Sequence, residues 1–383
     1  MDDFSPITLT PSDQSWHTDE IQCALDKCRD AGGGTVVLAA GEWKIASIRL
    51  YSGTTLLLSS GAHLHASPNW QDYRNWQVPT TLGYVNSPYI RKLWNIPDHY
   101  VNAPITAFEA ENVAVIGEPD SWIDGADCVD PNGEEKFRGP MGMVFCKCRN
   151  VTLRGYTYRN SANWCHQLDS CTNVRMDHVT VLAGHDGINL HHCVGVWIEH
   201  CDFRTGDDCI AGYNAENVTV RDCSLNTSCN SFRIGAKNLL VERCRFWGPG
   251  EYPHRISGRH NTLCAFEYYA MLYDRCDRDS ENWVIRDCTL EGLDSLIHYN
   301  YGGDWMHSAR PLKDITFQRI TVTGMTGASR LCTIPEAPLQ VKMEDVTLGW
   351  KGQRPDQILH ASEEVTLILR NVKIQQNEIL QHK

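Results

Sequence analysis

The 383-residue sequence has no excess of positive charge: 35 basic residues stand against 47 acidic ones, a formal net charge of −12. A nucleic-acid-binding protein needs a basic face for the phosphate backbone, so we expect no nucleic acid partner. The chain also lacks a run of eighteen apolar residues, so we expect no membrane span. Its first residues, MDDFSPITLTPSD, lack both a basic cluster and an apolar stretch. We therefore expect no secretory signal and a cytoplasmic location.

Cysteine is abundant, with 17 residues, but the CxxC spacing typical of zinc sites is absent. Without a secretory signal, reduced thiols are a simpler interpretation than disulfides. Many of the cysteines recur at equivalent positions of a repeat, which is typical of small apolar side chains stacked in a core. We therefore expect no metal ligands and no cofactor.

A short phrase recurs along the chain: a polar residue, alternating apolar positions, then cysteine or valine. It begins in steps of 21 to 23 residues at Asn150, Asn173, Gly195, Asn217 and Asn238, and returns at Asn282, Asp314, Gln340 and Glu364. One β-patterned phrase per period of about 22 indicates a solenoid. The units have neither the helix nor the leucine-framed consensus of a leucine-rich repeat. The sequence therefore predicts an all-β fold, a parallel β-helix in which residues one period apart become neighbours.

The N-terminal region differs from these repeats. Residues 18–29 place Ile21, Ala24, Leu25 and Cys28 at helical spacing, which predicts a helix that caps the open end of the solenoid. We expect residues 1–383 to form a single domain with insertions near 66–105, 247–281 and 293–312.

Acidic residues coincide with the repeat at one place. Asp186, Asp208 and Asn230 are separated by 22 residues each, so they should share one face, with Asp207 beside Asp208. Crowded carboxyl groups raise one another's pKa, so one can donate a proton while another accepts one. Glycoside hydrolysis needs this division, which makes Asp186, Asp207 and Asp208 candidate catalytic residues. Acidic residues that only shape turns, or that bind calcium, are the alternatives.

Four segments, AGEWKIASIRLYSGTTLLLSSGAHLHAS, NSANW, HDGINL and RTGDDCIA, resemble glycoside hydrolase family 28, the polygalacturonase-like enzymes. The resemblance extends over most of the chain and is strongest in RTGDDCIA. It implies a right-handed parallel β-helix and hydrolysis with inversion. It also implies that Asp207 is the general acid and that Asp186 and Asp208 activate the water.

The chain departs from this family at several positions. Asn230 stands in place of the family's histidine, and Gly212 and Tyr213 stand where a lysine is expected. No clear equivalent of the family's Arg-x-Lys pair follows Arg233. These departures weigh against uronate recognition and favour a neutral or differently charged sugar. Arg233 itself either contacts the substrate or pairs with an aspartate.

Seven side chains around the carboxylates are candidates for substrate binding: Trp164, His166, His185, Tyr213, Asn230, Arg233 and Tyr299. Histidines that only make hydrogen bonds within a coil, and tyrosines that only cover it, are the alternative interpretations.

The sequence thus predicts an inverting glycoside hydrolase. Long insertions around a cleft favour attack at chain ends, and the expected cytosolic setting favours small oligosaccharides or glycosides as substrates. A β-helix lyase, epimerase or transferase is one alternative, and a non-catalytic carbohydrate-binding solenoid is another. The sequence does not identify the sugar, the linkage or the oligomeric state.

Overall fold

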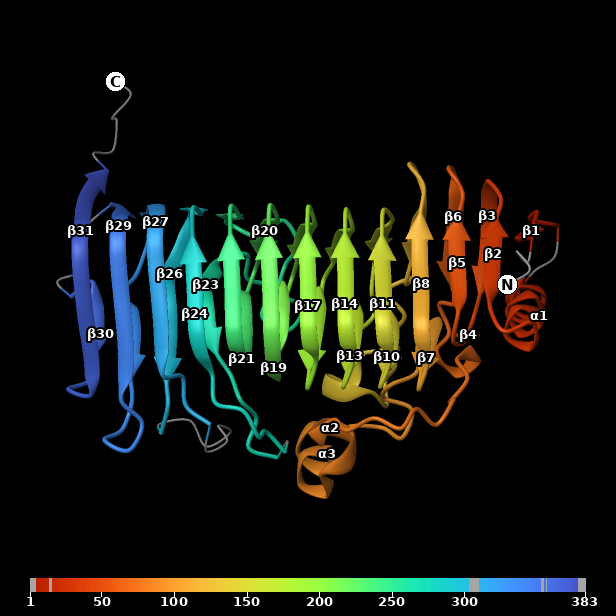
Figure 1. Ribbon diagram of the computed structural model, residues 1–383, viewed down its shortest axis with the longest axis horizontal. Coiled ribbons are helices and arrows are strands. Elements are labelled where there is room, and N and C mark those ends of the chain that lie inside the picture. Colours follow the sequence, from red (N-terminus) through yellow and green to blue (C-terminus); the bar gives the residue numbers. More distant parts are fainter. Residues whose placement is uncertain are drawn as a thin grey trace. The chain divides into compact units, whose positions relative to one another are not determined.

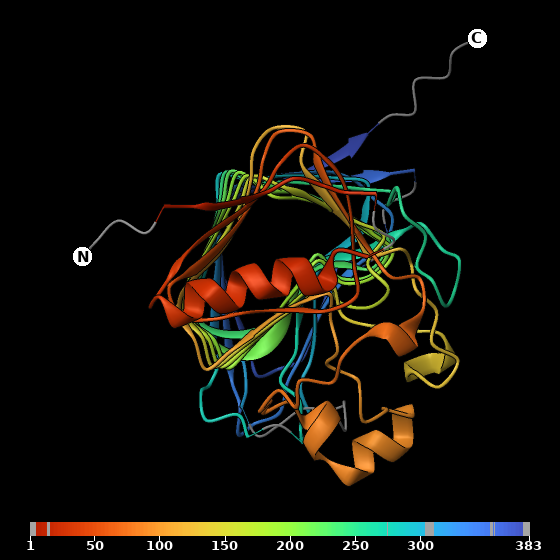
Figure 2. The ribbon, with the colours of Figure 1, turned by 90° about the vertical axis from the view of Figure 1, so that its right-hand side faces the viewer.

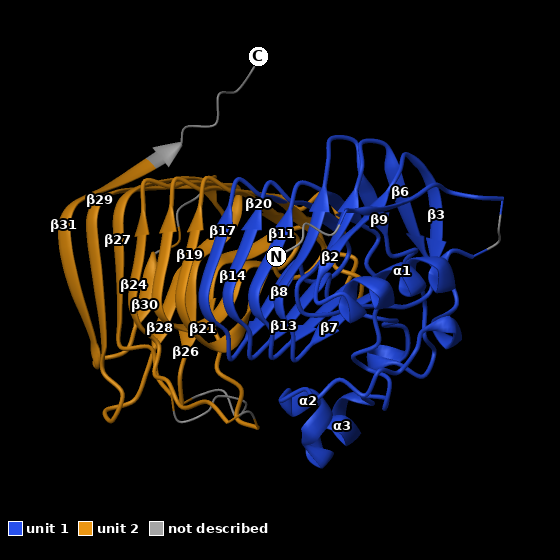
Figure 3. Cartoon of the chain, turned by 45° about the vertical axis from the view of Figure 1, so that its right-hand side comes forward, with its two compact units in different colours: residues 1–202 blue, residues 203–383 orange. Residues whose placement is uncertain are grey.

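The computed structural model describes residues 5–13, 16–273, 275–302, 310–352, 355 and 357–377. Short parallel strands dominate (Figure 1), and the predicted all-β, right-handed parallel β-helix is confirmed. The chain divides by its internal contacts into two compact units, residues 1–202 and 203–383 (Figure 3), which are described separately. The single domain over residues 1–383 stays a prediction. No helix among the described residues combines the length and apolar character that a membrane crossing requires.

Unit 1 consists of three columns of parallel strands. The first column contains β1 (Ile7–Leu9), β2 (Gly34–Leu38), β5 (Thr54–Leu58), β8 (Glu111–Gly117), β11 (Arg149–Arg154), β14 (Thr172–Asp177) and β17 (Val194–Glu199). The second contains β3 (Gly41–Ile45), β6 (Ala62–Ala66), β9 (Trp122–Asp124), β12 (Thr157–Arg159) and β15 (Thr180–Ala183). The third contains β4 (Ile48–Leu50), β7 (Ile105–Phe108), β10 (Met143–Cys146), β13 (His166–Asp169) and β16 (Ile188–His191).

Unit 2 repeats this arrangement, after β18 (Asp202–Thr205). Its first column contains the second half of β19 (Ile210–Arg221), the second half of β21 (Asn230–Glu242), β24 (Glu281–Arg286), β27 (Asp314–Met325), β29 (Leu339–Lys351) and β31 (Val365–Asn377). The second contains β20 (Ser224–Thr227), β22 (Arg245–Trp247) and β25 (Thr289–Glu291). The third contains the first halves of β19 and β21, then β23 (Thr262–Tyr268), β26 (Leu293–Asn300), β28 (Ser329–Cys332) and β30 (Leu359–Ala361).

The repeated phrase builds both the core and the turns. Its apolar positions stack in register and are buried, as in Val151, Val174 and Val196 of unit 1. Its leading asparagines adopt positive φ and form a ladder of side-chain hydrogen bonds; in unit 2, Asn238 donates to Asn217 at 2.8 Å and Asn282 donates to Asn238 at 2.9 Å. Asparagine tolerates this left-handed conformation better than most residues, which explains its recurrence at the start of the phrase.

The cysteines behave as the repeat predicts. All 17 are free thiols, and most are buried. Cys171 and Cys193 lie one coil apart in unit 1, and each thiol donates to a carbonyl two residues earlier, at 3.6 Å and 3.4 Å. These thiols fill the turn of each coil as small, nearly apolar side chains.

The predicted capping helix is confirmed as α1 (Thr18–Asp30), which lies across the end of the unit 1 coils (Figure 2). The four residues of its apolar stripe are buried: Ile21, Ala24, Leu25 and Cys28.

The insertions differ in part from their predicted extents. Residues 66–105 leave the coil as expected, but they contain η1 (Trp70–Asp72), α2 (Gly83–Asn86) and α3 (Pro88–Trp94). The region 247–281 is interrupted by the coil strand β23, which leaves two shorter loops. The region 293–312 begins as the coil strand β26, and its residues 303–309 lie outside the described part of the chain. A further loop between β9 and β10, which contains η2 (Glu134–Lys136), was not predicted.

Candidate active site

Asp208 in unit 2 is buried and fixed from two sides. The backbone N–H and side-chain amide of Asn230 donate to Asp208 Oδ1 at 3.2 Å and 2.9 Å, and Arg233 Nε donates to Asp208 Oδ2. The period of the repeat places Asn230 on the next strand, and Arg233 follows on the same strand, β21. Of the two roles left open for Arg233, the structure contains the ion pair with an aspartate.

Burial and charge act in opposite directions on Asp208. Burial raises the pKa of this carboxyl group above its ordinary value, the guanidinium of Arg233 lowers it, and the neighbouring Asp207 raises it again. The net direction is upward, because desolvation penalises the charged form most. Asp208 therefore competes for protons more strongly than an exposed aspartate does.

Asp207 occupies a different environment although it is the adjacent residue. Its side chain keeps 16% of its surface exposed. Its backbone carbonyl accepts hydrogen bonds from the hydroxyl groups of Thr205, at 2.6 Å, and Thr227. Two side chains thus fix the backbone of Asp207, while its carboxyl group lies where another molecule can reach it.

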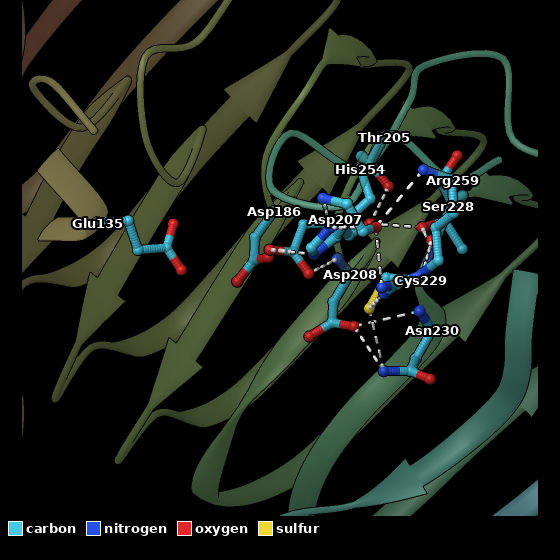
Figure 4. Close-up of polar contacts among 12 residues, drawn as sticks. Glu135, Asp186, Thr205, Asp207, Asp208, Ser228, Cys229, Asn230, His254 and Arg259 are labelled. Carbon is cyan, nitrogen blue, oxygen red and sulfur yellow. Dashed lines mark hydrogen bonds and ion pairs between the residues drawn. The ribbon is translucent and has the colours of Figure 1, made fainter. Parts of the chain in front are cut away.

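His254 lies beside Asp207, with its Nε2 3.8 Å from Asp207 Oδ2 (Figure 4). It belongs to the loop after β22, where Ser228 donates its hydroxyl to the carbonyl of Tyr252 and Asn226 Oδ1 accepts from the backbone N–H of Glu251 at 2.7 Å. The backbone N–H of Ser257 donates to His254 Nδ1 at 3.3 Å, which places the ring proton on Nε2, facing Asp207. Sequence reasoning missed His254, because its loop has no repeat that would place it.

Cys229 and Arg259 complete this cluster and were also missed. Arg259 donates to the Sγ of Cys229 at 3.3 Å and to the carbonyl of Ser228 at 3.2 Å. Burial raises the pKa of the Cys229 thiol, and the carboxyl groups of Asp208 and Asp207 raise it further. The thiol is therefore neutral near pH 7.

Asp186 lies in unit 1 and is likewise buried. The side-chain amide of Asn189 donates to Asp186 Oδ2 at 2.9 Å, and the Asp186 carbonyl accepts from the backbone N–H of Cys165 at 2.8 Å. The position of Asp186 next to Asp207 and Asp208 stays a prediction from the 22-residue spacing.

Comparison with known proteins finds similarity to one family of glycoside hydrolases. The sequence profile of Glycosyl hydrolases family 28 matches residues 90–227, which include all three aspartates. A probable polygalacturonase from Vitis vinifera is 28% identical over 196 residues, which cover 49% of this chain and 38% of that protein. The match therefore spans less than two thirds of the relative's own length. Over this part of its length the chain is similar to the polygalacturonase-like proteins of family 28.

Solved structures share the fold of this chain. An exopolygalacturonase from Thermotoga maritima superimposes with a TM-score of 0.74 at 17% identity, over 96% of this chain and 91% of that one. A polygalacturonase from Erwinia carotovora ssp. carotovora gives a TM-score of 0.67 at 19% identity, over 96% of both chains. At these identities the likeness concerns the fold.

Aromatic side chains from the insertions contact two of the unit 1 candidates, Trp164 and His185. The rings of Tyr84 and Tyr100 meet Trp164 edge-on, with centroids 5.0 Å and 5.8 Å away. Phe137, from the loop that was not predicted, stacks on His185 at 5.9 Å. Trp164, Tyr84 and Tyr100 are all buried, so these contacts form a closed aromatic cluster that ties the insertions to the coil.

Three predicted substrate-binding residues are instead core residues of the coils. His166 is aligned with the buried Met143 and Ile188, so it occupies an inward position; its ring nitrogens lie 3.0 Å from the hydroxyl of Tyr156 and 3.0 Å from the carbonyl of Gly187. Tyr299 is aligned with the buried Leu331. Tyr213 is fully buried at a β-bulge. These three side chains are buried in the coils, because side chains alternate in direction along a strand. Their contact with a substrate stays a prediction.

Proposed function

We propose that this protein is a glycoside hydrolase that inverts the anomeric centre and removes units from the ends of small acidic oligosaccharides. The observation that supports this most is the pair of neighbouring aspartates in different environments. Asp208 is buried and fixed by Asn230 and Arg233, whereas Asp207 is partly exposed beside His254. Two carboxyl groups with unequal environments are what an acid and a base in one site require.

The roles follow from these environments. Asp207 donates the proton to the leaving glycosidic oxygen, because it is the carboxyl group that a ligand can reach. Asp208 accepts a proton from the attacking water, and Arg233 and Asn230 hold its oxygens in place. Asp186 assists Asp208, a role supported by the family resemblance and the repeat spacing. Inverting hydrolases use a carboxylic acid and a carboxylate in this way.

A cavity in unit 2 supports an acidic substrate. Its volume is about 580 Å³, and it is lined by His298, Ala328, Arg330, Cys332 and His360. His298, Arg330 and His360 are aligned with one another on β26, β28 and β30. They continue a row of side chains on the outer face of the coils that begins at Arg233 and Glu267.

Distance and charge in this row suit an oligosaccharide. Strands lie about 4.8 Å apart, so His298 lies about 10 Å, and His360 about 19 Å, along the row from Arg233. A guanidinium group binds a carboxylate with two parallel hydrogen bonds. The cavity therefore favours a uronate at some distance from the cleaved bond and revises the expectation of a neutral sugar, since a local basic site can override a net charge of −12.

Two further parts of the proposal rest on other features. The segments that carry His254 in unit 2 and Tyr84 in unit 1 are insertions between coil strands, and insertions of this kind support attack at chain ends. The 17 free cysteines support a reducing compartment such as the cytoplasm.

The test is a screen of oligogalacturonides, their methyl esters and neutral aryl glycosides, with proton NMR of the first product. We expect a product of inverted configuration, and a loss of about a thousandfold in kcat for Asp207→Asn, within the range of general acid catalysis. Asp287→Asn, which removes a turn carboxylate paired with Arg319, is the matched control and should keep full activity. A retained configuration, an unsaturated product or full activity of Asp207→Asn would refute the mechanism.

A further inference from the structure

The candidate acid, Asp207, and two neighbouring side chains, Cys229 and His254, form a set of soft and hard donor atoms. A carboxylate oxygen of Asp207, the Sγ of Cys229 and a ring nitrogen of His254 lie within 4.8 Å of one another (Figure 4). They come from three separate segments of unit 2: the turn before β19, the turn between β20 and β21, and the loop after β22. The backbone contacts of Thr205, Thr227 and Ser228 hold these segments in place without any bound ion.

The donor types select the kind of ion. A thiolate and an imidazole are ligands of zinc and related transition metals, whereas calcium and magnesium take oxygen ligands. Ligand atoms of a tetrahedral zinc ion are about 3.5 Å apart, given Zn–S of about 2.3 Å and Zn–N of about 2.0 Å. The 3.8 Å between His254 Nε2 and Asp207 Oδ2 is close to this separation.

The surroundings suit a bound cation in two further ways. Cys229 and His254 are 8% and 9% exposed, so bulk water competes little for the ion. In the metal-bound state Nδ1 of His254 gives up the hydrogen bond from the Ser257 backbone N–H and donates instead to the Ser257 hydroxyl, 3.1 Å away, which leaves the lone pair of Nε2 for a metal. The metal-free and metal-bound states thus differ by a shift of the ring proton from Nε2 to Nδ1.

We propose that Asp207, Cys229 and His254 bind one Zn²⁺ ion with three protein ligands and one open position. Binding displaces the thiol proton of Cys229, which is released to solvent, so affinity rises with pH. Given the proposed function, a bound ion also occupies the carboxyl group that would protonate the leaving oxygen. Zinc is therefore a reversible inhibitor of this site, although the sequence predicted no metal ligand.

Binding is tested on the full-length protein after treatment with a chelator, by titration with ZnCl₂ against a chromophoric chelator. We expect one ion per chain, with the dissociation constant raised about a hundredfold or more in Cys229→Ser and in His254→Gln, since these remove ligands themselves. Co²⁺ in place of zinc should give a thiolate-to-metal absorption band that Cys229→Ser lacks. Circular dichroism and the thermal midpoint show whether each variant is folded.

A second cluster provides the matched control. Asp177, His178 and His200 lie in unit 1 with both Nδ1 atoms within 2.9 Å of one carboxylate oxygen, and their side chains are 35–63% exposed. The variant carrying His178→Asn and His200→Asn should keep the zinc affinity and the cobalt band of the wild type. Loss of zinc in this variant alone, or an absence of binding in the wild type, would overturn the proposal.

Inhibition is measured separately, as the fraction of each protein's own activity lost on adding zinc and recovered with EDTA. We expect at least a tenfold loss for the wild type and less than a twofold loss for Cys229→Ser. Because zinc binding and the cobalt spectrum do not depend on turnover, they stand or fall independently of the hydrolase activity. Bound zinc at this cluster without any inhibition of a measurable activity would refute the regulatory part.

Discussion

Two of the aspartate–arginine pairs that join successive coils in unit 2, Asp208–Arg233 and Asp222–Arg243, differ mainly in burial. Asp208 and Arg233 are 2% and 19% exposed in their side chains, and Asn230 also donates to the carboxylate. Asp222 and Arg243 are 32% and 48% exposed and form two parallel hydrogen bonds of 2.8 Å and 2.9 Å.

The pair Asp222–Arg243 has the better hydrogen-bond geometry, with two parallel bonds, but it is an exposed pair that only links two turns. Water screens it, so it adds little to stability. The first pair holds a charge away from water, which raises the proton affinity of Asp208 and makes it available for chemistry. The repeat therefore supplies the same pairing more than once, and burial distinguishes the pair that belongs to the candidate site.

Breaking each pair at the arginine is the most direct test of this difference. Arg233→Gln leaves Asp208 buried without its cation and should lower the free energy of unfolding by about 3 kcal/mol or more. Arg243→Gln should lower the urea midpoint much less, since Asp222 stays solvated. The buried Glu242, the other partner of Arg243, keeps its pair with Arg286. Equal midpoints for the two variants would show that burial does not separate the pairs.

His166 shows the effect of burial on a titratable side chain that has no ionic partner among the residues that the structure describes. Burial lowers the pKa of His166 in unit 1 from 6.5 to about 4, partly opposed by its hydrogen bond to the Gly187 carbonyl. The folded pKa lies below the unfolded one, so the stabilising effect is complete above pH 6.5 and is lost as the pH falls towards 4. Between pH 7 and pH 5 this group should remove about 2 kcal/mol from the free energy of unfolding.

The measurement is urea denaturation of the wild type and His166→Gln at both pH values. The variant should lose less stability on acidification than the wild type does. His178→Asn, in an exposed turn, is the control and should follow the wild type. Parallel losses in all three proteins would mean that His166 already takes up its proton in the folded state.

Much of this arrangement was predictable from the period of the repeat. A spacing of 22 residues predicts that Asn230 lies next to Asp208, one coil further along. The apolar residues at helical spacing in 18–29 predict α1. The inward direction of the His166 side chain was also predictable, since the residue one period later, Ile188, alternates with Leu190 as an apolar position of its strand. His254 and Arg259 were not, because they lie in a loop without a period and reach Asp207 and Cys229 only through contacts that folding creates.

The cavity lined by His298, Arg330 and His360 contains a third kind of charged group, an arginine without an aspartate partner in the described ranges. Within the described part of the chain, Arg330 forms no ion pair, and its Nε donates only to Cys332 Sγ at 3.5 Å. Arg330→Gln should raise KM for oligogalacturonides about tenfold, about 1.4 kcal/mol, with kcat nearly unchanged. Methyl-esterified substrates should be unaffected. Arg319→Gln, which loses a turn pair with Asp287, serves as the control. An equal change for charged and esterified substrates would exclude a carboxylate in this cavity.

The smallest expected effect concerns the asparagine ladder, where polar groups serve structure alone. Asn238 has a φ of +58° and hydrogen bonds to Asn217 and Asn282, and the equivalent residue of an earlier repeat, Gly195, has a φ of +69°. Asn238→Ala loses the bonds and tolerates the left-handed conformation less well than asparagine does, whereas Asn238→Gly loses the bonds but adopts that conformation without strain. The alanine variant should therefore be less stable than the glycine variant by about 1 kcal/mol, measured as the difference in free energy of unfolding in urea. A glycine variant as unstable as the alanine variant would show that the side-chain ladder, and not the backbone conformation, accounts for asparagine at the start of each phrase.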